Sequence, residues 1–394
     1  MNQSDELKSE GKRRVLYVSP NGYLGGAERF VLNACLGHLK YGEYKPHILF
    51  FNSGEFVEIA KEHGIEVSVL PFPFKLTSIK SLGKLRLFLM SFFKAHDFTV
   101  INNTMPYSQI AMSLGGSTGI PKVWFQHGPV GGTLDKLATA TSFDALFFNT
   151  QYLKNLHHQF LNLRKPNKFE RIVHYGIPFE EHEEQRILSL REQLIEGRDY
   201  LMITAGRICS WKGYHLTIRA LNNLYEKDKE IVKKCKLIIV GEAKRESDIL
   251  YLEQLKSESK NLVDDGIIEF HPFTNELSLY FAASDLFIHS STTPEPFGLV
   301  VAEAMIQGCL VVGGAAGGVR EVLNSKKTGF IFHSHQEGAE VELENILKEI
   351  LEKHSQNNNF EELRTSGERK IRNEFSIEKM TKNLEESYTE LCKK

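Results

Sequence analysis

The chain has 394 residues, of which 41% are hydrophobic and 25% are charged, so it has the composition of a globular protein and is long enough for two domains. Its 48 basic and 50 acidic residues leave a formal net charge of −2, which gives no overall argument for binding to nucleic acid. The five cysteines are scattered without a C-x-x-C pair, which argues against a disulfide scaffold or a structural zinc site and favours a reduced, cytoplasmic setting.

Residues 1–13 are polar and are expected to form a disordered tail without the apolar core of a signal peptide. No later stretch reaches the roughly 20 apolar residues that span a bilayer. The nearest candidate, residues 80–95, is interrupted by Lys84 and Arg86. It is expected to form an amphipathic helix, which either packs on a sheet or touches an anionic membrane through its basic face.

Short apolar runs alternate with helical stretches along most of the chain. The first half contains RVLYVSP, KPHILFF, EVSVLPF, FTVINNT, KVWFQH, ALFFNT and RIVHYG, and the second half contains YLMITAG, KLIIVGE, GIIEFHPF, LFIHSS, LVVGG and GFIF. Continuously apolar strands separated by helices indicate parallel sheets that are buried on both faces. Thirteen strands exceed one compact doubly wound sheet, so the sequence predicts an α/β protein with two Rossmann-like domains.

The break between these domains is expected in the highly charged segment between Gly176 and Asp199. Ser376 is expected to cap a final amphipathic helix. Because ligands bind at the carboxyl ends of the strands in such sheets, two facing domains would line one central cleft. The predicted parts are the tail at 1–13, an N-terminal domain at 14–178, a linker at 179–198 that could hold a surface helix, a C-terminal domain at 199–375 and the final helix at 376–394.

The first predicted strand ends in a glycine-rich loop just before a helix. Gly22, Gly25 and Gly26 would let a ligand approach the backbone and would leave the N–H groups of the helix end to an anion. The spacing is neither G-x-G-x-x-G nor that of a P-loop, and tight strand-to-helix turns use glycine without any ligand. Ligand contact and a simple turn therefore both stay open.

His127 lies at the end of a predicted buried strand and before another glycine-rich loop. Strand ends are where functional polar groups lie in this architecture. A lone histidine is more often structural or on the surface, so a ligand contact and a structural role are the two alternatives.

Two cations, Arg207 and Lys212, follow the first strand of the second domain and precede a helix. Arginine can bind two phosphate oxygens at once, and lysine adds a mobile point charge beside the helix N-terminus. The loop is therefore predicted to bind a diphosphate, with two solvated surface cations as the alternative.

Two glutamates lie around a second helix start in the segment STTPEPFGLVVAEAMIQG. The helix is predicted to begin near Gly298, so that the N–H groups of Leu299 and Val300 face an anion. Glu303, one turn further, can accept hydrogen bonds from the vicinal diol of a ribose, and Glu295 can reach an attached sugar. The arrangement suits a nucleotide sugar, although acids near helix N-termini are also common without any ligand.

These segments together resemble the retaining glycosyltransferases of family 4, which have the GT-B fold. The resemblance extends over nearly the whole chain from about Arg14 and rests on GGAER, GRICSWKG, EPFGLVVAEAM and GGVREVL…TGF in this order. Its most specific part is the pair of glutamates with seven residues between them around PFG. It implies two Rossmann-like domains facing a central cleft, with the C-terminal helix crossing back onto the N-terminal domain.

By this resemblance, Arg207 and Lys212 bind the donor diphosphate and Glu303 binds the ribose hydroxyls. Glu295 binds the donor sugar and His127 contacts it, so these two are the candidate catalytic residues. The donor is expected on the C-terminal domain, and the acceptor on the N-terminal domain near the glycine loop.

The expected activity is transfer of a hexose-type sugar, with retained configuration, from a nucleoside diphosphate sugar to a hydroxyl of a glycan or lipid-linked acceptor. Surface polysaccharide or lipid-linked glycan synthesis is the expected setting, in the cytoplasm or peripherally on the inner face of the membrane. The sequence has no D-x-D motif, so neither a metal nor a cofactor is expected, and Arg207, Lys212 and the helix end would neutralise the leaving diphosphate. Phe273 is the candidate to stack on the base.

Three alternatives stay open at this point. A nucleotide-sugar epimerase of the same fold would need no acceptor, and a non-catalytic subunit would bind a sugar nucleotide without turnover. A nicotinamide dehydrogenase is disfavoured, because the chain lacks G-x-G-x-x-G with a following ribose-binding acid.

Overall fold

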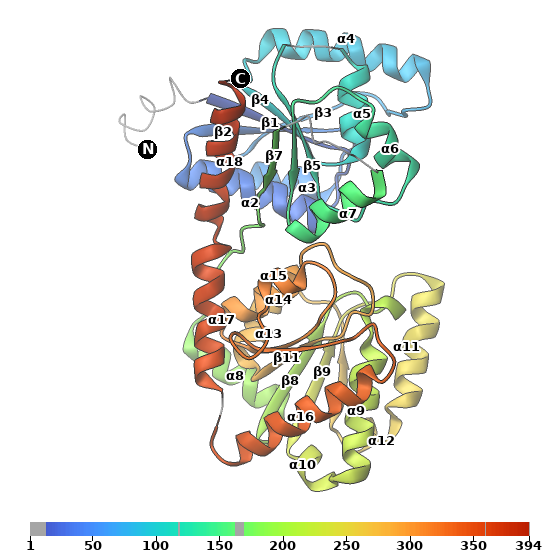
Figure 1. Cartoon of the computed structure of the whole chain (residues 1–394), viewed down its shortest axis with the longest axis vertical. Helices are drawn as coiled ribbons and strands as arrows, with labels where there is room; N and C mark the ends of the chain where they lie inside the picture. The colour runs from blue at the N-terminus through green and yellow to red at the C-terminus, as the bar shows by residue number, and fades with distance from the viewer. Residues whose placement is uncertain (1–12, 117–118, 162–168, 359, 394) are drawn as a thin grey trace. The chain divides into compact units, whose positions relative to one another are not determined.

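The computed structural model describes residues 13–116, 119–161, 169–358 and 360–393. The tail predicted at residues 1–13 therefore lies outside the described residues, except for Arg13. The chain forms two compact units (Figure 1). Unit 1 contains Met1–Gly176 and Phe375–Lys394, and unit 2 contains Ile177–Glu374.

Unit 1 is built on a seven-stranded parallel sheet in the order β3-β2-β1-β4-β5-β6-β7. The central strands β4, β5 and β6 are buried along their whole length, as expected for strands covered on both faces. The seven strands predicted in the first half of the chain are thus confirmed. They are β1 (Arg13–Ser19), β2 (Tyr44–Phe50), β3 (Glu66–Val69), β4 (Val100–Asn103), β5 (Lys122–Gln126), β6 (Ala145–Phe148) and β7 (Phe169–Ile172).

The helix predicted near residues 80–95 is α4, which begins after Ser78, whose side chain accepts a hydrogen bond from the N–H of Ser81. Its inner face buries Leu85, Leu89 and Phe92 in the core of unit 1. Within the described ranges, no helix has the length and apolar character needed to cross a bilayer. The helices of the first part of unit 1 are α2 (Gly26–Tyr41), α3 (Glu55–Glu62), α4 (Ile79–Ala95), α5 (Pro106–Leu114), α6 (Thr133–Thr139) and α7 (Gln151–Leu161).

Unit 2 is built on a six-stranded parallel sheet in the order β10-β9-β8-β11-β12-β13. The strand order reverses between β8 and β11, which is the doubly wound arrangement of nucleotide-binding domains. The six strands predicted in the second half are confirmed. They are β8 (Tyr200–Ala205), β9 (Cys235–Val240), β10 (Ile268–His271), β11 (Leu286–His289), β12 (Leu310–Gly314) and β13 (Phe330–Phe332).

The segment 179–198, predicted as a linker that could hold a surface helix, is part of unit 2. Its helix α8 (Glu184–Ile195) buries Leu194 and Ile195. Arg191 on this helix donates hydrogen bonds to the carbonyl of Ala283 at 2.9 Å and to the Asp285 carboxylate at 2.8 Å. The high charge of the segment therefore anchors the helix instead of marking a free linker. The other helices of unit 2 are α9 (Tyr214–Lys227), α10 (Lys229–Lys233), α11 (Glu246–Glu258), α12 (Lys260–Asp264), α13 (Leu277–Ala283), α14 (Leu299–Ile306), α15 (Val319–Val322), α16 (Ala339–Ser355) and α17 (Glu361–Glu374), with the 3-10 turn η1 (Ser210–Lys212).

The C-terminal helix α18 (Ile377–Leu391) belongs to unit 1, where it lies beside α2 (Figure 1). Ser376 caps it by accepting a hydrogen bond from the N–H of Lys379. Close packing on α2 depends on Gly37, where an added Cβ would lie 2.0 Å from the hydroxyl oxygen of Thr381.

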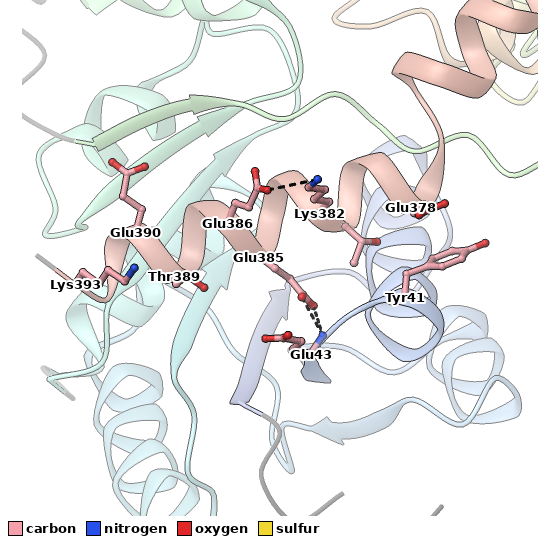
Figure 2. Close-up of a pocket in the computed structure, with 10 residues that line it drawn as sticks. Tyr41, Glu43, Glu378, Lys382, Glu385, Glu386, Thr389, Glu390 and Lys393 are labelled. Carbon is pink, nitrogen blue, oxygen red and sulfur yellow. Dashed lines mark hydrogen bonds and ion pairs between the residues drawn. The ribbon is translucent and has the colours of Figure 1, made fainter. Parts of the chain in front are cut away.

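A chain of polar contacts joins α18 to the core of unit 1. Glu385 accepts hydrogen bonds from the backbone N–H of Glu43 (Figure 2), and its carboxylate lies 2.7 Å from Nδ1 of His38. The other ring nitrogen of His38 lies 2.9 Å from the hydroxyl of Tyr17, which lies 3.1 Å from the hydroxyl of Tyr388. The predicted final helix is thus fixed to the N-terminal unit by buried side chains as well as by apolar packing.

Candidate functional site

The loops that follow β8 and β11 meet at the carboxyl edge of the unit 2 sheet, where the strand order reverses. Such an edge is the usual ligand crevice of a doubly wound sheet. The hydroxyl and the N–H of Thr292 both donate to the carbonyl of Trp211, at 3.1 and 2.8 Å. Gly213 has a φ of +69°, and a Cβ there would lie 2.0 Å from the carbonyl oxygen of Ser290, so only glycine lets the two loops approach this closely.

Glu295 is the centre of a polar cluster on these loops. Its Oε1 atom lies 2.6 Å from Nζ of Lys212, 2.6 Å from the hydroxyl of Ser291 and 3.0 Å from Nε2 of His289. The side chains of Lys212 and Glu295 are only 14% and 13% exposed. Burial alone would raise the pKa of the Glu295 carboxyl, but the charge and hydrogen bonds of His289 and Lys212 outweigh it and hold that pKa well below its ordinary value. Glu295 is therefore a carboxylate at neutral pH.

The main chain of Glu295 is held as firmly as its side chain. It forms a bridge with Gly317, and the N–H of Gly318 donates to its carbonyl at 2.8 Å. A Cβ on Gly317 would lie 2.2 Å from the carbonyl oxygen of Glu295. The glycines after β12 thus fix the position of the glutamate loop.

Helix α14 begins beside this cluster, at Leu299, as predicted. Gly298 is its N-cap with a φ of +93° and provides no side-chain cap, and a helix leaves its first N–H groups, here those of Leu299 and Val300, without partners inside the helix. Glu303, half-buried, follows Leu299 by about one turn. The start of α14 therefore offers N–H donors and a positive dipole end near the Glu295 loop.

Arg207, the other cation of the predicted diphosphate loop, is exposed and lies beside Lys212. Its Cζ atom is 5.8 Å from the ring centroid of Trp211, and Nζ of Lys212 is 4.8 Å from the same centroid. The structure therefore brings together Arg207, Lys212 and Glu295 at one edge of the sheet. Phe273, the candidate to stack on the base, is 60% exposed. It follows β10, which is separated from β8 in the sheet by β9.

His127 in unit 1 is buried, with 8% of its surface exposed, and its ring stacks on Phe125 at 4.3 Å. Its Nδ1 lies 2.8 Å from the hydroxyl of Tyr175, while Nε2 has no partner among the described residues. Burial lowers the pKa of His127 to about 3, so the ring is neutral at physiological pH.

The glycine loop of unit 1 leads into α2, with Gly25 as N-cap and Gly26 as the first helical residue. Phe30, about one turn along α2, lies 4.7 Å from the ring of His127, so the helix start and the histidine share a neighbourhood. Asn21 donates to Glu28 at 2.8 Å. The loop also borders a surface pocket lined by Asn21, Gly22, Tyr23, Asn52, Ser53, Gly54 and Glu55.

Comparison with known proteins identifies the kind of molecule. Residues 186–363, all within unit 2, match the family described as glycosyl transferases group 1. The chain is a glycosyltransferase with the GT-B fold, and the match to this group lies in unit 2.

Two relatives are similar to this chain over different lengths. An uncharacterized glycosyltransferase of Haemophilus influenzae is 23% identical over 329 residues, which are 81% of this chain and 86% of that protein. The human GDP-Man:Man(3)GlcNAc(2)-PP-Dol alpha-1,2-mannosyltransferase is 28% identical over 165 residues, 40% of this chain and 33% of that enzyme.

Two solved structures share the whole fold. HepE of Anabaena, crystallised in complex with UDP, has a TM-score of 0.80 at 21% identity, with 96% of this chain and 100% of that chain covered. A glycosyltransferase from Rickettsia africae has a TM-score of 0.81 at 18% identity, with 97% and 99% covered.

Two residues of this candidate site were not predicted from the sequence. His289 and Ser291 both contact Glu295, and both lie in the predicted strand LFIHSS, of which the structure forms Leu286–His289 as β11. The available signal was a histidine at a strand end, which is the same signal that made His127 a candidate.

Proposed function

We propose that this glycosyltransferase moves a sugar from a nucleoside diphosphate sugar to an acceptor hydroxyl with retained configuration, without a metal or a cofactor. The observation that carries the proposal is the cluster of Lys212, Glu295 and the start of α14 at the carboxyl edge of the unit 2 sheet. The HepE structures support the donor class, since they hold UDP and UDP-glucose.

In this proposal the diphosphate lies against Arg207, Lys212 and the N–H groups of Leu299 and Val300. Arg207 is exposed, and Lys212 has three N–H donors, of which Glu295 takes one. These cations and the helix end would stabilise the charge that develops on the leaving diphosphate.

The sugar and the ribose would be bound by the two glutamates. Glu303, on α14, accepts from the ribose hydroxyls, and Phe273 contacts the base. Glu295, as a carboxylate, accepts from a sugar hydroxyl and stabilises the positive charge at the anomeric carbon. As the bond from this carbon to the phosphate oxygen breaks, the acceptor oxygen forms its bond on the same face and its proton passes to the phosphate. His127, being neutral, would contribute a hydrogen bond to the sugar rather than a charge.

Calorimetric titration with UDP, GDP and ADP tests the donor site, with NAD as a comparison. We expect one nucleoside diphosphate to bind best and Glu303→Ala to weaken it by about tenfold, equivalent to one lost charged hydrogen bond. Glu352→Ala is the matched control, because Glu352 is a 49% exposed acid on α16 of the same unit. Absence of binding to every diphosphate, or equal loss in both variants, would contradict the proposal.

We also propose that the acceptor is a glycan or a lipid-linked glycan, bound by unit 1 near Gly25 and Gly26, with unit 1 touching the inner face of the cytoplasmic membrane. Two relatives act on such molecules by name: the human mannosyltransferase, and the lipopolysaccharide 1,2-N-acetylglucosaminetransferase of Salmonella typhimurium, which is 26% identical over 185 residues, 46% of each chain.

Helix α4 supplies the membrane contact in this proposal. Leu87 and Met90 are 70% and 54% exposed and stand near Lys84 and Arg86 on a helix that contains no acidic residue. We expect the protein to sediment with anionic but not zwitterionic vesicles, and Leu87→Glu with Met90→Glu to abolish sedimentation. Leu250→Glu, at a 62% exposed leucine of α11 in unit 2, should change nothing. Equal sedimentation of all three proteins would refute this role of α4.

A further inference from the structure

His289 ends β11 and is buried, with 4% of its surface exposed. Its Nε2 lies 3.0 Å from Oε1 of Glu295, and its Nδ1 has no partner among the described residues. With Nδ1 buried and unpaired, Nε2 carries the proton and donates to the carboxylate. Among the described residues, the one polar contact that orients the His289 ring is therefore with Glu295.

The polar contacts of the Glu295 side chain are asymmetric. Among the described residues, the contacts from Lys212, Ser291 and His289 all reach Oε1. The second oxygen, Oε2, is then the atom that can accept a hydrogen bond from a ligand. Such an arrangement fixes the plane of the carboxylate while leaving one acceptor for a substrate hydroxyl.

The three contacts would not respond equally to a donor. On the proposed function, the diphosphate competes for the charge of Lys212, which weakens the lysine's hold on Glu295. His289 and Ser291 have no such competitor, because the histidine makes its donor contact from inside the core and Ser291 is 2% exposed. The carboxylate would thus depend most on His289 and Ser291 when the donor is bound.

We infer that His289 is a positioning residue for sugar transfer, which holds Oε1 of Glu295 so that Oε2 meets a hydroxyl of the donor sugar. This inference rests on the proposed function and goes beyond it, because it assigns His289 to the positioning of the sugar, whereas Arg207 and Lys212 bind the diphosphate.

The test compares His289→Leu, which removes the donor, with His289→Gln, which keeps a side-chain N–H of similar reach. For His289→Leu we expect kcat/KM with the nucleotide sugar to fall by about 100-fold, as for a catalytic group misplaced by roughly 1 Å. The Kd for the bare nucleoside diphosphate should stay within about twofold of the original chain, and His289→Gln should recover at least about tenfold of the lost kcat/KM.

The matched control is His47→Leu, which removes another buried histidine, 3% exposed, that contacts a glutamate, Glu66, at 3.2 Å but lies in unit 1. It should leave kcat/KM unchanged, and melting curves show whether each variant is folded. Unchanged kcat/KM in His289→Leu would overturn the inference, as would a parallel loss of diphosphate affinity without recovery in His289→Gln. If the original chain binds no nucleoside diphosphate at all, the proposed function itself fails, which is a different result.

Discussion

Substitution of Gly317 by alanine should reduce the rate of sugar transfer strongly while the protein stays folded. A Cβ there would lie 2.2 Å from the carbonyl oxygen and 2.8 Å from the nitrogen of Glu295, and the residue has a φ of +74°. Gly308 offers a matched control in the same unit, because its φ is +77° and a Cβ there would meet nothing within 4 Å. Alanine at either position adopts the same unfavourable left-handed backbone, but only at Gly317 does it collide with the site.

The expected magnitudes follow from these contacts. Gly308→Ala should cost about 1–2 kcal/mol for the left-handed conformation, and Gly317→Ala should cost about 1–3 kcal/mol more for the overlap. To reach an ordinary contact of 3.4 Å instead of 2.2 Å, the Glu295 backbone must shift by about 1.2 Å. A displacement of this size lowers catalysis by about 100-fold when it moves a catalytic group.

Thermal unfolding and initial rates with the nucleotide sugar measure both effects. A domain of this size loses about 2–4 °C in Tm per kcal/mol, and the melting curves show whether both variants are folded at the assay temperature. We expect kcat/KM to fall by about 100-fold in Gly317→Ala and by less than about threefold in Gly308→Ala. If both variants lose activity in proportion to their loss of Tm, Gly317 has no special relation to Glu295 and the reasoning is wrong.

Three further predictions concern unit 1. Tyr388→Phe removes the hydroxyl that accepts from Asn102 at 2.8 Å, so it should lower the free energy of unfolding by about 1–3 kcal/mol in a denaturant titration while the affinity for nucleotide is unchanged. The pKa of His127 falls from 6.5 to about 3 on folding, so the unfolded chain binds the proton first and the free energy of unfolding should decrease as pH falls from 6.5 toward 3. In urea unfolding, His127→Gln should make this decrease smaller. Equal pH dependence in the original chain and in His127→Gln would contradict the prediction. Burial alone would raise the pKa of Glu66, but Lys45 and Arg14 outweigh this effect and lower that pKa from 4.5 to about 2. The carboxylate therefore stabilises the fold above pH 4.5, and this stabilisation is lost as pH falls toward 2. Glu66→Gln should narrow the difference in Tm between pH 7 and pH 3, by a small amount because the side chain of Glu66 is 35% exposed.

The strands were predictable because burial on both faces leaves a direct mark on the sequence. β9 reads as CKLIIV and β5 as KVWFQ, and every residue of both is buried. The loops at the strand ends could be located for the same reason, so the chain position of Arg207, Lys212 and Glu295 already suggested one edge of one sheet.

The pairing within that edge could not be predicted. Lys212 and Glu295 are 83 residues apart, and their 2.6 Å contact depends on the neighbouring places of β8 and β11 in the sheet and on the approach that Gly213 permits. The contact of His289 with Glu295 could not be predicted for a different reason. It depends on a loop after β11 that turns back toward the end of the strand within six residues.

The segment 179–198 was predicted as a linker from its high charge, and the surface helix that it could hold is α8. Most of α8 is exposed, but Leu194 and Ile195 at its end are buried, and Arg191 forms an ion pair with Asp285. A helix that covers the side of a sheet needs only a narrow apolar stripe, which a count of charges over the whole segment does not reveal.

The Lys212–Glu295 pair is better explained by binding than by stability. Removing two charges from water costs free energy that their attraction only partly offsets, so a buried pair is weak evidence for a stabilising role. On the proposed function, the loops that bind the diphosphate concentrate positive charge, and the carboxylate of Glu295 offsets part of that charge. Gly317 holds the main chain of Glu295 and His289 holds its carboxylate. Because neither contact involves Lys212, on the proposed function the lysine can bind the diphosphate without releasing the glutamate. The diphosphate and the sugar would then depend on different contacts of the same two loops, which is why changes at Gly317 and His289 are expected to reduce sugar transfer and spare nucleotide binding.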